Sequence, residues 1–89
     1  MNIVDLLNYP VDHDEVYVNL CIRLHNKPRG QIALKLFKAI RWLGMDYTDK
    51  QFRKIYRKCR RLPKTEILGW VNHIYVWEII PVGLYSIIA

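Results

Sequence analysis

Apolar side chains recur at helical spacing through much of the chain, and the clearest case lies between residues 48 and 62. Thr48 with Gln51 three positions later is a capping-box pattern, and Tyr47 and Phe52 are spaced as a hydrophobic staple. A single apolar stripe follows at intervals of three and four residues. It comprises Phe52, Ile55, Tyr56, Cys59 and Leu62. The sequence therefore predicts a helix over residues 48–62.

Two earlier segments show the same period and predict two more helices, at residues 12–25 and 31–43. The first begins with a second capping pattern, Asp12 followed by Glu15, and Gly44 is placed to end the second. Their inward-facing positions are Val16, Leu20, Cys21 and Leu24 in the first helix, and Ile32, Ala33, Leu36, Phe37, Ile40 and Leu43 in the second. Three helices therefore occupy residues 12–62, after a short lead-in segment at 1–11.

The pattern changes in the last third of the chain, where helical spacing gives way to β-branched and aromatic side chains. Residues 66–89 are rich in Ile, Val, Trp and Tyr, and Gly69, Pro81 and Gly83 interrupt them. This composition is typical of strands, so we expect two or three antiparallel strands that form a β-hairpin. The predicted fold class is α+β, with three helices and a C-terminal hairpin in one domain that spans the 89 residues.

Charge is distributed unevenly along the chain, whose net charge is +6. All Lys and Arg lie between Arg23 and Lys64, where 14 cations and two acids, Asp46 and Asp49, give a charge of +12. On the helix predicted at 48–62, the cations lie opposite and beside the apolar stripe. They are Lys50, Arg53, Lys54, Arg57, Lys58, Arg60 and Arg61. Such a face favours a polyanionic partner, either nucleic acid or an anionic membrane surface.

Three segments carry a resemblance to a known family: the turn Leu43–Met45, the helical motif Thr48–Ile55 and the ending Gly83–Ile87. Three helices followed by a hairpin, with the most basic helix third, resemble the winged helix-turn-helix family of DNA-binding domains. The resemblance covers most of Asp12–Ile88. It implies that the third helix enters the major groove, while the hairpin, or wing, contacts the adjacent backbone or minor groove.

The resemblance also implies a set of contact residues. Base contacts would come from Lys50, Gln51, Arg53, Lys54 and Arg57, and phosphate contacts from Arg29, Lys35, Lys38, Arg41 and Arg61. The chain departs from the family where Asp46 and Tyr47 lengthen the turn, and where the hairpin has no cation. The aromatic and aliphatic side chains of the hairpin are expected to form a wing or dimer interface instead. They are Trp70, Ile74, Tyr75 and Trp77.

Residue types that support catalysis or metal binding are present but are not spaced for it. His13, His25, His73, Cys21 and Cys59 show no paired ligand spacing, and no nucleophile, base and acid arrangement can be identified. The sequence therefore predicts no enzyme, no metal, no cofactor and no small-molecule substrate. The two cysteines are expected to be buried free thiols. Because residues 1–10 lack a signal peptide, a cytoplasmic location is expected.

The resulting hypothesis is a small protein that binds double-stranded DNA, with or without sequence specificity. Its small size suggests a transcriptional regulator of viral, phage or mobile-element type, and the hairpin suggests a homodimer. One alternative is a winged-helix interaction module that inhibits a host nucleic-acid-handling complex. Another is a single-pass membrane protein whose span is Ile67–Ala89, although Asn72, His73 and Glu78 would be costly within a bilayer.

Overall fold

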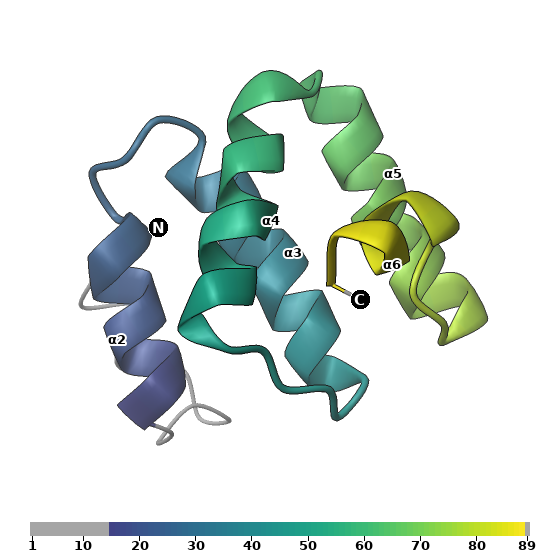
Figure 1. Cartoon of the computed structure of the whole chain (residues 1–89), viewed down its shortest axis with the longest axis horizontal. Helices are drawn as coiled ribbons and strands as arrows, with labels where there is room; N and C mark the ends of the chain where they lie inside the picture. The colour runs from purple at the N-terminus through teal and green to yellow at the C-terminus, as the bar shows by residue number, and fades with distance from the viewer. Residues whose placement is uncertain (1–14, 89) are drawn as a thin grey trace.

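The computed structural model describes residues 15–88, and this part of the chain folds into five helices with no strand (Figure 1). The helices are α2 (Glu15–Leu24), α3 (Gly30–Trp42), α4 (Asp49–Arg61), α5 (Lys64–Trp77) and α6 (Val82–Ile88). Figure 1 shows α2 on one side of α3 and α4, with α5 and α6 on the other side. The predicted lead-in at 1–11 and the Asp12 cap lie outside the described residues.

The three helices expected within residues 12–62 are confirmed, and so is the capping box of the third. The Thr48 hydroxyl accepts from the Gln51 backbone N–H at 3.1 Å, and the Gln51 side chain accepts from the Thr48 backbone N–H at 2.8 Å. The rings of Tyr47 and Phe52 lie 6.5 Å apart, as a staple requires. The left-handed residue that follows α3 is Gly44, with a φ of 80°. Local sequence signals thus fixed where α4 begins and α3 ends.

The core is centred on α3, which packs against α2, α4 and α5. Its fully buried residues include Leu36, Phe37 and Ile40, and the Phe37 ring stacks on Phe52 of α4 with centroids 4.8 Å apart. The start of α3 lies directly against the end of α2. A Cβ at Gly30 would come within 1.9 Å of the Leu24 carbonyl oxygen, so only glycine permits this approach.

The prediction of a β-hairpin at residues 66–89, and with it the α+β class, is wrong. Residues 64–77 form α5 and residues 82–88 form α6. Ile67 and Ile74 are fully buried, and Trp70 and Val71 between them are partly buried against the core. Counted from Ile67, the other three positions follow after three, four and seven residues, so all four lie on one face of a helix. Burial of this face against α3 outweighs the strand preference of the individual residues. Without a wing, the described residues form an all-helical fold.

The last helix docks on α4 and α5, which gives the C-terminal segment a structural role (Figure 1). Leu84 is fully buried, and the close fit of α6 over α5 is seen at Gly83, where a Cβ would meet the Trp70 ring at 3.4 Å. The Gln51 side-chain amide donates to the Ile88 carbonyl at 2.8 Å. This bond joins the start of α4 to the end of α6.

No single helix among the described residues is long and apolar enough to cross a membrane. Helices α5 and α6 reach that length and apolarity only when taken together, and they are bent by 100° at the break between them. Glu78 ends α5 in the left-handed conformation, with a φ of 56°. Residues 67–88 therefore belong to two helices rather than to one continuous helix.

Replacing Thr48 with Ala should lower the free energy of unfolding by about 1 kcal/mol, because the cap hydroxyl would no longer satisfy the Gln51 N–H. Thr65→Ala is the matched control, since Thr65 is exposed in the first turn of α5, where the structure shows no side-chain cap. Urea denaturation of the three proteins measures the difference. Equal unfolding midpoints would contradict the capping role.

Replacing Leu84 with Ala should cost about 2–5 kcal/mol of stability, because the Leu84 side chain is fully buried on the inner face of α6. Val82→Ala should change stability by less than about 0.5 kcal/mol, because Val82 is 87% exposed. The two variants distinguish a helix from a hairpin. In a strand, residues 82 and 84 would lie on the same face, so their substitution would have similar effects. Similar losses for both variants in thermal or urea unfolding would argue against α6.

Candidate nucleic-acid interface

The basic face predicted for the third helix is present on α4. All seven cations of α4 are exposed, while Phe52, Ile55 and Cys59 on the opposite face are buried. The exposed cations are Lys50, Arg53, Lys54, Arg57, Lys58, Arg60 and Arg61. The apolar stripe holds α4 against the core, so the cations are displayed on a rigid helix rather than on a mobile segment.

In the described part of the chain, few of these charges are neutralised by an acidic side chain. Asp49 is the one acid of α4, and its carboxylate contacts Arg53 at 3.0 Å and Arg23 of α2 at 3.0 Å. Arg23 also lies over the Phe52 ring, with its guanidinium carbon 4.0 Å from the ring centroid. Within residues 15–88, no ion pair involves the other six cations of α4. Their combined field is therefore directed at solvent.

A hollow of about 260 Å³ lies between α4 and α6 along this face. Lys54, Arg57, Lys58 and Arg61 line one wall, and Ser86 and Ile87 line the other. No acidic side chain lines it. Four cations from two successive turns therefore converge on one depression that could accept the phosphates of a polyanion.

Gln51, one of the five residues expected to contact bases, is already engaged within the protein. Its side-chain oxygen accepts from the Thr48 backbone, and its side-chain nitrogen donates to the Ile88 carbonyl. Using this amide to read a base would require both bonds to break. The structure therefore leaves Lys50, Arg53, Lys54 and Arg57 as the candidates that remain available on the N-terminal part of α4.

Arg29, expected to contact phosphate, instead holds the α2–α3 turn against the end of α4. Its guanidinium donates to the Leu62 carbonyl, and its backbone adopts the left-handed conformation with a φ of 56°. Nearby, the Tyr56 hydroxyl donates to the Pro28 carbonyl at 2.8 Å. These bonds fix the turn on α4, so Arg29 has a structural role whether or not a ligand binds.

The other predicted phosphate contacts have different environments, and only Arg61 lies in the hollow. At 100° per residue, Lys35 lies about 160° around α3 from Phe37, whose ring faces α4. Lys35 is exposed and therefore points away from the basic face. Lys38 and Arg41 are partly buried. The structure thus separates Lys35 from the cations of α4.

Three cations that were not among the predicted contacts lie at the interface: Lys27, Lys58 and Arg60. The ammonium of Lys27 lies 5.6 Å from the Tyr56 ring centroid, and the guanidinium of Arg60 lies 6.0 Å from it. Arg60 could be placed beside the basic face from helical spacing alone. Lys27 could not, because its position depends on how the α2–α3 turn folds onto α4. The sequence placed Lys58 on the basic face of the helix. It could not predict that Lys58 lines a hollow, because the second wall of that hollow is formed by α6.

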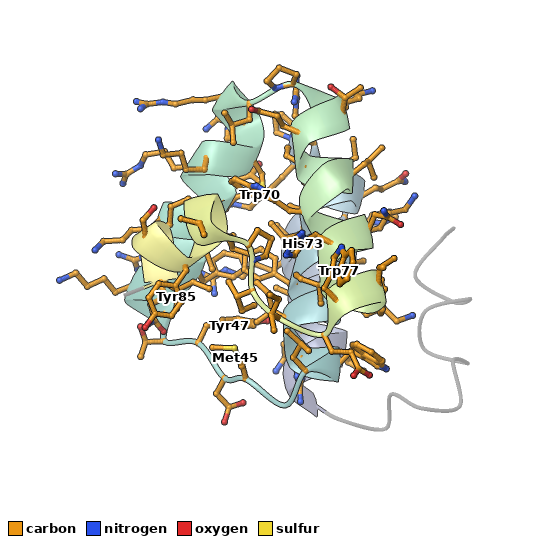
Figure 2. The ribbon with its side chains drawn as sticks, turned by 90° about the vertical axis from the view of Figure 1, so that its right-hand side faces the viewer. Met45, Tyr47, Trp70, His73, Trp77 and Tyr85 are labelled. Carbon is orange, nitrogen blue, oxygen red and sulfur yellow. The ribbon has the colours of Figure 1, made fainter. Side chains whose placement is uncertain are left out.

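The four residues assigned to a wing or dimer interface have different environments on α5. Ile74 is fully buried and Trp70 is partly buried under α6, so both contribute to the core. Tyr75 is 41% exposed, and its ring centroid lies 5.0 Å from the ring centroid of Trp42 on α3. Trp77 is 66% exposed near the end of α5 (Figure 2). The expected four-residue interface is therefore corrected to two exposed aromatic side chains on different parts of the surface.

Comparison of the chain with protein-family models, with curated proteins and with solved structures finds no match. Its function must therefore be argued from the chemistry of its surfaces.

Cys21 and Cys59 are confirmed as buried free thiols. Burial raises the pKa of the Cys59 thiol to about 11, an effect that the nearby Arg29 guanidinium offsets only in part. The thiol of the folded protein therefore stays protonated at neutral pH. This makes Cys59 a core residue rather than a candidate nucleophile.

Because the pKa of Cys59 is higher in the folded than in the unfolded protein, its contribution to stability should fall as pH rises above about 9. The loss should approach about 1.4 kcal/mol per pH unit until the folded thiol ionises near pH 11. The measurement is the difference in unfolding free energy between the wild type and Cys59→Ala across pH 7–11. A difference that is constant with pH would contradict the raised pKa.

Proposed function

We propose that this chain binds double-stranded DNA through the exposed cations of α4. The observation that carries the proposal is that six of the seven cations on this helix have no carboxylate partner among the described residues. A phosphate backbone is a regular array of negative charge, and neutralising it releases condensed counterions. The same field repels a basic protein surface and offers a neutral one no electrostatic attraction, so a polyanion is the partner that this face fits.

The shape of α4 supports a helix-in-groove mode. Its 13 residues span roughly 20 Å, and a major groove about 12 Å wide accepts one helix. Lys50, Lys54 and Arg57 point away from the core and are the proposed base contacts. Arg53 can join them by leaving Asp49, because an exposed ion pair four residues apart on a helix is worth only about 0.3–0.5 kcal/mol.

The hollow beside α6 supplies the proposed phosphate contacts. Lys58 and Arg61 lie in it with Lys54 and Arg57, and α6 closes its other side with Ser86 and Ile87. A strand of the duplex that follows this wall would place its phosphates beside Lys58 and Arg61. Phosphate contacts of this kind set the position and orientation of α4 but carry no sequence information.

Lys58→Gln should weaken binding to a short DNA duplex several-fold and reduce the slope of log K against log salt by about 1, because one phosphate contact is lost. Lys35→Gln is the matched control. It removes the same charge from an exposed helical position that points away from α4. Fluorescence anisotropy titrations at several salt concentrations measure both quantities.

The result expected for Lys35→Gln is an affinity close to that of the wild type, with an unchanged salt slope. Equal losses for the two variants would indicate a diffuse attraction and would overturn the assignment to α4. Binding of polyglutamate as tightly as DNA at matched salt would show that the face recognises acidic polymers in general. Absence of binding at low salt would overturn the proposal itself.

A further inference from the structure

A second surface, distinct from the basic face, is formed by exposed apolar side chains around the α5–α6 connection. Trp77 is 66% exposed, Ile79 58%, Val82 87% and Tyr85 58%. Isolated exposed apolar residues are common, but here four large ones lie within nine consecutive positions, and Ile79 and Tyr85 line one hollow, which is an arrangement typical of interaction sites. We call these four residues the apolar face.

A hollow lies within this surface. It has a volume of about 380 Å³, and its lining is mainly apolar. The lining residues are Leu43, Met45, Glu78, Ile79, Ile80 and Tyr85. Figure 2 shows Met45 below Tyr85, and Trp77 across from Tyr85 on α5. The surface therefore offers both a depression and protruding side chains next to it.

The distribution of charge limits what can cover the apolar face. Residues 65–88 contain Glu66 and Glu78 and no Lys or Arg. An anionic membrane would favour an apolar patch with a rim of cations, whereas here the nearest charged residue, Glu78, is itself anionic. Two copies of this chain, each with a net charge of +6, repel one another least where they meet at the surface that carries no cation.

We propose that a second copy of this chain covers the apolar face in a twofold-symmetric dimer. In such a dimer both subunits use the same surface. A protrusion on one subunit can therefore fill the depression on the other, and the reverse contact forms at the same time. The hollow of each subunit would receive a protruding side chain of the other, with Trp77 and Val82 as the candidates. The core around Leu84 would remain unchanged.

The size of the apolar face sets the strength of the dimer. Two aromatic and two aliphatic side chains at these exposures, with the rim of the hollow, offer on the order of 600 Å² per subunit. This falls at the lower end of specific interfaces, which typically bury about 800 Å² per partner. We therefore expect reversible association with a Kd in the micromolar range. The proposal does not depend on DNA binding, since the basic face lies on α4.

The test compares two variants that make the same substitution at similarly exposed sites. Ile79→Asp places a charge in the apolar face, where Ile79 is 58% exposed, and Ile22→Asp places one on α2, where Ile22 is 53% exposed. Figure 1 shows α2 on the far side of α3 and α4 from α5. Both variants lower the net charge from +6 to +5, so they change general repulsion equally. Thermal unfolding of each variant checks that the fold is retained.

Sedimentation equilibrium in the absence of DNA, from low micromolar to several hundred micromolar protein, measures the association. The wild type and Ile22→Asp should show the same monomer–dimer equilibrium, and Ile79→Asp should raise the dimer Kd at least tenfold. A wild type that remains a monomer of 10.7 kDa throughout would overturn the proposal. Equal effects of the two substitutions would also overturn it, because the association would then not involve the apolar face.

Discussion

Repulsion among the cations of α4 is the constraint that the rest of the structure offsets. Seven Lys and Arg lie within 13 residues, and like charges three or four positions apart destabilise a helix by roughly 0.2–0.5 kcal/mol per pair. Burial of the opposite face offsets this repulsion, because fully burying one large apolar side chain contributes roughly 1.5–3 kcal/mol. Phe52, Ile55 and Cys59 are all buried against the core. The helix forms because one side is buried, and its other side is consequently free to concentrate charge.

Neighbouring segments add polar contacts that hold α4 along its length. At its start, Gln51 bonds both to Thr48 and to the carbonyl of Ile88 on α6. In its middle, Tyr56 bonds to the carbonyl of Pro28, and at its end the Leu62 carbonyl accepts from Arg29. Each contact uses a side chain or carbonyl on the flank of the helix. The outward cations are left available, which is the arrangement that a surface for a polyanion requires.

The sequence predicted the elements whose signals are local and missed those that depend on packing. Thr48 and Gln51 marked the start of α4 because a capping box acts within four residues, and Gly44 marked the end of α3 in the same way. Residues 66–89 were assigned to strands because β-branched and aromatic residues favour them. The sequence also contains helical spacing in this segment, at Ile67, Trp70, Val71 and Ile74. That spacing stabilises a helix only because α3 packs against these side chains and buries them. The same dependence explains why the engagement of Gln51 by α6 could not be foreseen.

Helix α6 connects the two surfaces on which the proposals rest. Through Leu84 it is anchored in the core, and through Ser86 and Ile87 it forms one wall of the basic hollow. Val82 and Tyr85 of the same helix are exposed in the apolar face. Three roles are compatible in seven residues because the helical period points neighbouring side chains in different directions, whereas a strand would offer only two faces. The replacement of the expected wing by a short helix therefore allows the C-terminal segment to shape the basic surface while it presents a second surface that carries no cation.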